Sequence, residues 1–171
     1  TLTGSLDVDD IAQRIVASVL PALRALSLGF RLVEPDGSLK IIAQGQEAGV
    51  PALHGHVVPP GYGISGKVAA EGRPVVTADV LNDPNIRLID EMRQVVETSN
   101  IGAFLAVPLR LQDKVIGVLS VADTTGRRFT EEETALLQTF ADQAALALDH
   151  TRLYAQTRQR LRHVESIRKV V

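Results

Sequence analysis

The segment Gly61-Tyr62-Gly63-Ile64-Ser65-Gly66 has the residue types and spacing of a phosphate-binding loop. It matches the pattern Gly-x-Gly-x-x-Gly, and Asp83 follows about 20 residues later, where a dinucleotide-binding unit carries the acid that contacts the ribose. Such a unit needs an unbroken buried strand before the loop and a full-length helix after it. Here Pro59 and Pro60 interrupt the approach and Gly72 ends the helix early, so the surroundings disfavour a dinucleotide site.

The same glycines also approach the pattern Gly-x-x-x-x-Gly-Lys, which ends at Lys67. The next residue is Val68, so the hydroxyl that would hold magnesium beside a phosphate is missing, and we exclude a P-loop. Two interpretations stay open. Either the N–H groups at the start of a helix from Ile64 form a weak anion site, or the glycines only allow a tight loop that caps this helix.

Few other residues offer catalytic or metal chemistry. His54 and His56 are two residues apart, but no third His or carboxylate cluster accompanies them, so we interpret them as solvated loop residues and predict no metal site. Cys is absent, which removes thiolate ligands and cysteine nucleophiles, and neither Gly-x-Ser-x-Gly nor His-Glu-x-x-His occurs. The sequence therefore favours a binding or regulatory protein over an enzyme.

The composition describes one globular domain without a nucleic-acid or membrane partner. The chain has 171 residues, of which 45% are apolar and 22% charged, with a formal net charge of -2. This balance offers no electrostatic attraction for nucleic acid, and no apolar run approaches the roughly 20 residues that cross a bilayer. Because Cys and a signal-peptide pattern are both absent, we expect a cytoplasmic protein. The chain stops inside a helical pattern, so we also expect a longer parent.

The elements that must position any site follow from periodicity. Apolar residues at every fourth position after Asp7 predict an amphipathic first helix, which Pro21 should kink or end. Alternation around Phe30 and an apolar run at 39–43 predict a hairpin, and Asp83 is expected to cap a helical stretch that reaches about residue 97. Between these come a loop at 44–61 with a short strand near Val57 and Val58, a short helix at 64–71 and a strand at 75–77.

The strongest strand patterns lie at 103–109 and 115–121 and are joined across residues 112–114. Their near-continuous apolar character is typical of the centre of a sheet that is covered on both faces. Thr130 with Glu133 three residues later forms a capping box, which predicts the start of a long helix.

The order of these elements and seven short motifs resembles the GAF domain family over about residues 5 to 155. The resemblance implies fold class α+β: a central antiparallel sheet of five or six strands, with the N- and C-terminal helices on one face and a ligand pocket beneath short helices and loops on the other. We predict a GAF-like sensory domain at residues 1–155 and the start of a coiled-coil-like signalling helix at residues 156–171. The motifs are Gly61 to Val68, Gly72 to Val76, Asp79-Val80, Asp83-Pro84, Leu105 to Leu109, Ile116 to Leu119 and Phe129-Thr130.

The resemblance also bears on cofactors. Bilin-binding members have polar residues at the positions of Phe104 and Ala106, and with no Cys to attach a chromophore we predict no covalent bilin. Haem-binding members use a His that residues 80–101 lack, so we predict no haem. Cyclic-nucleotide-binding members carry a longer motif, of which this chain keeps Phe129 and Glu133 only; this ligand is disfavoured but stays open. Members that reduce free methionine sulfoxide depend on cysteines, so this activity is excluded here.

In the family, the strand at 105–109 forms the pocket floor, and the resemblance to bilin-binding members implies that Phe104 and Ala106 face the ligand; alternation then turns Leu105 and Val107 toward the helices. Ordinary core filling is the alternative role for the apolar members of the predicted pocket, and surface charge is the alternative for Asp79, Arg87 and a further polar candidate, Lys67. The predicted ligand-binding residues are Ile64, Ser65, Val76, Asp79, Ile86, Arg87, Leu88, Met92, Phe104 and Ala106.

We hypothesise that an unidentified small molecule orders residues 82–99 over the sheet and that the terminal helices pass this state to an output domain of the histidine kinase, cyclase or transcription-factor class. A rival hypothesis is a dimerisation and signal-relay module whose pocket is filled by its own Phe104 and Met92. A heptad-like seam predicts a parallel homodimer through Leu153, Thr157, Val164, Ile167 and Val171.

Overall fold

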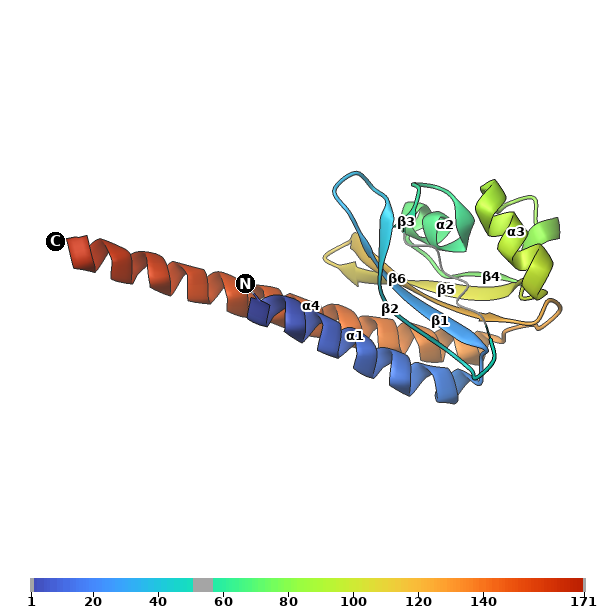
Figure 1. Ribbon diagram of the computed structural model, residues 1–171, viewed down its shortest axis with the longest axis horizontal. Helices are drawn as coiled ribbons and strands as arrows, with labels where there is room; N and C mark the ends of the chain where they lie inside the picture. The colour runs from blue at the N-terminus through green and yellow to red at the C-terminus, as the bar shows by residue number, and fades with distance from the viewer. Residues whose placement is uncertain (1, 51–56, 171) are drawn as a thin grey trace.

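The computed structural model describes residues 2–50 and 57–170 and, within them, the side chains of residues 7–50, 57–151 and 161. A long helix lies at each end of the described chain, with the strands and short helices between them (Figure 1). The elements are α1 (Leu2–Leu23), β1 (Ser27–Val33), β2 (Leu39–Gln46), β3 (Val57–Val58), α2 (Gly63–Glu71), β4 (Val75–Thr77), a 3-10 turn (Val80–Asn82), α3 (Asp90–Ser99), β5 (Ala103–Leu111), β6 (Lys114–Asp123) and α4 (Glu131–Val170).

Within the described residues the strands form one six-stranded sheet in the order β3-β2-β1-β6-β5-β4, and all neighbours are antiparallel. Helices α1 and α4 cover one face, while α2 and α3 lie over the other (Figure 1). The predicted α+β fold class and its layers are therefore confirmed. The β5–β6 hairpin turns through Gln112 and Asp113, both with positive φ, which suits the right-handed twist of the paired strands.

The sheet separates two apolar cores because alternate side chains of each strand point to opposite faces. On the helical face, Leu28 and Phe30 of β1 and Leu105 of β5 are fully buried against α1 and α4. Burial of such a side chain contributes about 1.5–3 kcal/mol, so this core supplies most of the stability. The other core lies under α2 and α3 and includes Val118 of β6 and Ala106 of β5.

The first helix begins earlier than predicted but ends close to Pro21, as predicted. It begins at Leu2, so Asp7 lies inside the helix and does not precede it. Pro21 does not divide the helix into two pieces, because it lies in the last turn and the helix ends at Leu23, followed by Arg24 with a positive φ of 52°. A proline so close to the end disturbs little of the hydrogen-bonded helix before it.

The residues after Asn82 also differ from their prediction, which was a helix capped by Asp83. Asp83 does not cap a helix; its carboxylate accepts a hydrogen bond from the Asn85 N–H at 3.0 Å, a local turn that competes with helix formation. Residues 83–89 remain non-helical, and α3 begins only at Asp90. Asp90 and Glu91 occupy its first turn, where the helix dipole favours acidic side chains.

The predicted capping box at the start of α4 is confirmed. The Thr130 N–H donates to Glu133 Oε1 at 2.9 Å, and the Glu133 N–H donates to Thr130 Oγ1 at 3.1 Å. From there α4 continues as one helix of 40 residues and extends well beyond the sheet (Figure 1). Among the residues that the structure describes, no helix combines the length and the apolar character that crossing a membrane requires.

Candidate functional site

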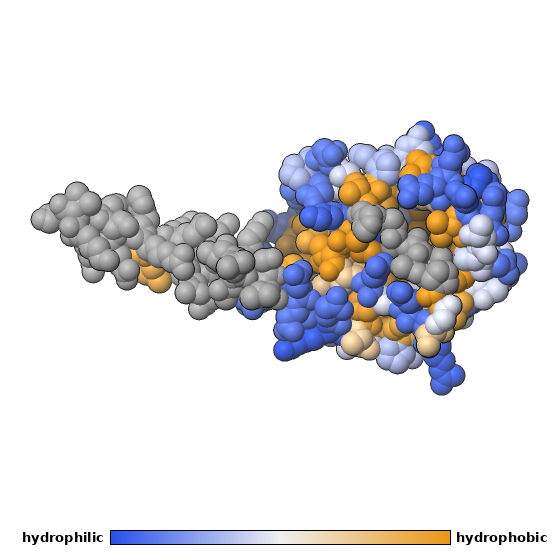
Figure 2. Space-filling view, in the orientation of Figure 1, coloured by the Kyte–Doolittle hydropathy of each residue, from blue (hydrophilic) through white to orange (hydrophobic). Residues whose placement is uncertain are grey.

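A cavity of about 410 Å³ lies on the face of the sheet opposite α1 and α4. Its size falls within the roughly 300–1,000 Å³ that small-molecule sites occupy. Figure 2 shows apolar residues gathered along the middle of the domain between hydrophilic outer regions. The described residues that line the cavity are Arg31, Gln44, Val57, Val58, Gly63, Ile64, Ser65, Val80, Leu88, Ile89, Glu91, Met92, Val95, Val96, Ile101, Phe104 and Ser120.

The pairing of strands β2, β1 and β6 determines which side chains form the floor of the cavity. Gly29 of β1 pairs with Gln44 of β2 on one side and with Ser120 of β6 on the other, so these three positions form a row across the sheet. Because Gly29 has no side chain, the middle of this row leaves space above the backbone of the sheet. Arg31 lies two residues further along β1 and therefore on the same face, as a diagonal neighbour of Ser120.

The roof comes from α2, α3 and the segment between them. Ile64 and Ser65 in the first turn of α2, Leu88 before α3, and Met92 on α3 all line the cavity. Ile64 and Ser65 are buried, because α2 packs down onto β5 and β6. A short helix that opens at glycines can approach the sheet closely in this way.

Arg31 gives the cavity its electrostatic character. Among the described side chains that are buried, it is the one that carries a charge, with 4% of its surface exposed. Desolvation by burial lowers the pKa of its guanidinium to about 10. The group therefore remains cationic at neutral pH, in surroundings where a charge interacts more strongly than in water. Buried Ser65 and Ser120 add hydroxyl groups to the same cavity.

Tyr62 and Arg87 hold the roof together. Arg87 Nη2 donates to Tyr62 Oη at 2.8 Å, and the guanidinium lies 4.5 Å from the centre of the Tyr62 ring. The Gly63 N–H donates to the Arg87 carbonyl at 2.7 Å. These contacts fasten the non-helical segment 83–89 to the start of α2. They also use the first N–H of α2, which the sequence offered as part of a weak anion site.

Half of the predicted ligand-binding residues line the cavity: Ile64, Ser65, Leu88, Met92 and Phe104. Ile86 and Ala106 are buried in the core of the same face but do not line the cavity. The predicted alternation of β5 is observed, since Phe104 and Ala106 face this core and Leu105 and Val107 face the helices.

The remaining predicted residues lie elsewhere. Val76 is 50% exposed and pairs with Leu105, so alternation turns it toward the helical face and not into the pocket. Arg87 is exposed and its guanidinium lies over the Tyr62 ring. Asp79 Oδ2 accepts a hydrogen bond from Asn82 Nδ2 at 2.7 Å. Lys67 forms an ion pair with Glu71 at 3.1 Å.

Sequence reasoning missed the polar residues of the floor. Arg31, Gln44 and Ser120 come from three different strands, and only the register of the sheet brings them together. A signal existed for Arg31. It alternates with Phe30 and Leu32 in a strand, so it had to point to the second face, which the sequence predicts to be covered.

Two further expectations concern metal ligands and the dimer seam. No group of three or more His, Asp or Glu side chains that could hold a metal ion occurs among the described residues, and His54 and His56 lie outside them. The proposed dimer seam at Leu153, Thr157, Val164 and Ile167 lies on α4, but these side chains, like the whole of Val171, are outside the described residues. The homodimer therefore stays a prediction.

Comparison with solved structures finds the same fold. The blue-light absorbing form of the Thermosynechococcus elongatus PixJ GAF domain superposes with a TM-score of 0.76 at 19% identity, covering 95% of this chain and 97% of that one. Free methionine-R-sulfoxide reductase from Neisseria meningitidis gives 0.71 at 23% identity, covering 86% and 81%. A domain of a two-component sensor histidine kinase protein from Sinorhizobium meliloti 1021 gives 0.68 at 18% identity, covering 88% and 96%.

At these identities the structural likeness shows the fold and not the function. The sequence itself provides the independent observation, because a family model described as "GAF domain" matches residues 5–149. With the six-stranded sheet, the two helical layers and the covered pocket described above, this chain belongs to the GAF domain family.

Proposed function

We propose that this chain is the regulatory, small-molecule-binding domain of a cytoplasmic signal-transduction protein and that it passes the state of its pocket to an output domain through α1 and α4. The observation that carries the proposal is the cavity of about 410 Å³. Most of its described lining is apolar, and a few polar groups converge on it, which is the usual character of a small-molecule site.

A regulatory role is favoured over catalysis. One structural relative is a reductase, but the chain has no Cys, so it has neither the nucleophile that this reaction implies nor a thiol for a covalently attached bilin. Another relative is a domain of a sensor histidine kinase protein. We propose an output domain of that general kind, to which the part of α4 beyond residue 155 connects. We also propose a homodimer formed through the terminal helices.

The rival function is dimerisation and signal relay without a ligand. It requires a pocket that Phe104 and Met92 fill by themselves. Both residues line the cavity, yet a metabolite-sized volume remains beside them, which favours ligand binding.

Native mass spectrometry of the freshly purified domain tests the proposal. We expect a small molecule that stays with the folded chain and leaves on denaturation. Val95→Phe, which adds bulk to the cavity wall, should reduce the retained mass, whereas Val76→Phe on the half-exposed opposite side of β4 should not. A wild-type protein that retains nothing and is not stabilised by any compound of a metabolite library would refute ligand sensing and leave the relay function.

A further inference from the structure

We propose that the cavity binds a small carboxylic acid with an apolar body, and that the Arg31 guanidinium at the floor of the cavity holds the carboxylate. This inference rests on the proposed sensory function and specifies the ligand class. Its starting point is the position of Arg31, which lies in the middle of β1, at 4% exposure, among the residues that line the cavity.

A cation in such a place is costly for the empty protein. Taking a guanidinium out of water incurs a desolvation cost, which is visible here as the lowered pKa of Arg31. An anion inside the cavity interacts strongly with this guanidinium, because a charge-assisted pair is strong where water is excluded. The planar guanidinium matches the two oxygens of a carboxylate.

The charge of the described lining favours a monoanion. Arg31 is its cationic member, and Glu91, exposed at the start of α3, is its acidic member. A phosphate monoester carries about two negative charges, which one guanidinium does not balance and which Glu91 would repel. A single carboxylate matches the single buried cation.

The rest of the cavity selects the body of the ligand. Ile64, Leu88, Met92, Val96 and Phe104 line it with apolar surface. A small inorganic anion would contact Arg31 but leave these residues uncovered. A branched or aromatic acid fills both parts, with Ser120 beside Arg31 as a further hydrogen-bond donor to the carboxylate.

The test compares acids with neutral partners of the same shape. We would titrate the wild-type domain with 4-methylpentanoate, 3-phenylpropanoate and octanoate, each beside its primary amide, and with inorganic phosphate, by calorimetry and ligand-observed NMR. We expect at least one acid to bind about ten- to a hundredfold more tightly than its amide, as a charge-assisted hydrogen-bond pair implies. Arg31→Gln should remove this preference and Arg31→Lys should keep part of it. Arg128→Gln, at an exposed arginine outside the lining, should change nothing.

The following outcomes of these experiments would contradict the inference. Amides that bind as tightly as acids, a preference that survives Arg31→Gln, or phosphate that binds more tightly than every acid would overturn the carboxylate assignment while the sensory function stands. The same holds if no acid binds although native mass spectrometry finds a retained molecule. If no acid or amide binds and nothing is retained, both proposals fail. Should Arg31→Gln not fold, Arg31→Met takes its place, since a preference for acids that survives in a variant without the cation contradicts a paired carboxylate.

Discussion

Replacing Arg127 with methionine should lower the free energy of unfolding, because Arg127 links the two helices of the helical layer to the end of the sheet. Arg127 lies in the connection between β6 and α4. Its Nη2 donates to the Leu23 carbonyl at 2.8 Å and to Glu133 Oε2 at 2.6 Å. Its Nη1 donates to the Arg24 carbonyl at 2.9 Å and to Asp123 Oδ2 at 2.5 Å. One side chain thus joins the C-terminal end of α1, the end of β6 and the first turn of α4.

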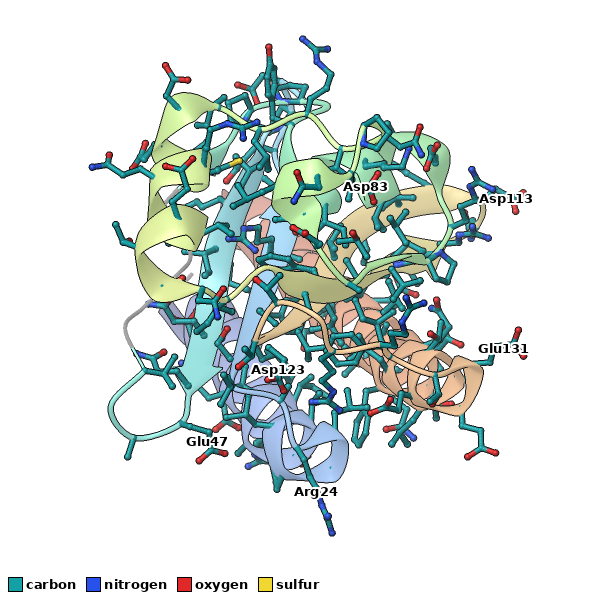
Figure 3. All side chains as sticks on the ribbon, turned by 90° about the vertical axis from the view of Figure 1, so that its right-hand side faces the viewer. Arg24, Glu47, Asp83, Asp113, Asp123 and Glu131 are labelled. Atoms are coloured by element: carbon teal, nitrogen blue, oxygen red, sulfur yellow. The ribbon has the colours of Figure 1, made fainter. Side chains whose placement is uncertain are left out.

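Figure 3 shows the end of the domain where these elements meet, with Arg24 directly after α1 and Asp123 above it in the view. The carbonyls at the end of α1 have no partner within the helix, and a cation there also suits the helix dipole. The guanidinium lies 4.4 Å from the centre of the Phe129 ring, which buries part of it. The methionine variant keeps much of the apolar stem but leaves two carboxylates, Asp123 and Glu133, without the cation between them.

We estimate a loss of about 2–4 kcal/mol in the free energy of unfolding. A hydrogen bond that involves a charged group contributes about 1.5–3 kcal/mol, but the contacts share one side chain and are not additive. The side chain of Arg127 is also 24% exposed, so solvent weakens its ion pairs. For a chain of this length, 1 kcal/mol corresponds to about 2–4 °C, which gives a decrease in Tm of about 4–16 °C.

Calorimetry and urea unfolding measure this loss, and Arg128→Met is the matched control because Arg128 is the exposed neighbour. We expect the control to stay within about 0.5 kcal/mol of the wild type. If Arg127→Met also remained within that range, the contacts would contribute no net stability, and the view of this residue as a structural link between α1 and α4 would be refuted.

Three further predictions concern other single groups. Burial raises the pKa of Glu133, but the Thr130 N–H and the Arg127 guanidinium outweigh it and hold this pKa below its ordinary value. The stability lost in Glu133→Gln should therefore be full at neutral pH and should shrink as the pH falls through the lowered pKa; a loss that does not change across this acid range in urea unfolding would contradict this. Arg31→Met should remove the increase in Tm that 4-methylpentanoate gives the wild-type domain, because the guanidinium that lines the cavity is gone; an unchanged increase would show that Arg31 does not hold the carboxylate. Tyr62→Phe should speed amide hydrogen exchange in residues 83–89 with a change in Tm of only a few degrees, and exchange at the wild-type rate would show that the 2.8 Å hydrogen bond does not hold the roof.

Much of the fold could be predicted because several local signals agree. The apolar runs at 103–109 and 115–121 become β5 and β6, two internal strands that are covered on both faces. The capping box of Thr130 and Glu133 determines where α4 begins, since both of its hydrogen bonds depend on residues three positions apart. Such features need no knowledge of distant parts of the chain.

The stretch from residue 80 to 90 could not be predicted in this way, because Asp83 is compatible with two local structures. The same carboxylate can cap a helix or bind the N–H two residues later, and the sequence offers Pro84 for the first. Distant contacts decide between them. The Arg87 carbonyl accepts a hydrogen bond from the Gly63 N–H of α2, and Leu88 packs into the pocket-side core, two contacts that the non-helical segment makes.

The pocket shows a further limit of local reasoning. Alternation places Phe104 on the correct face of β5, because residues of one strand share a face with period two. It could not place Val76 correctly, since the phase of a three-residue strand follows only from its pairing with Leu105. The row of Gln44, Gly29 and Ser120 depends on two pairings at once, each with its own register. Arg31 lies on the same face because it is two residues from Gly29 along β1, a position that its alternation with Phe30 already indicates in the sequence. A charged residue in a strand whose neighbours are buried is therefore worth testing as a ligand contact whenever a second layer covers that face.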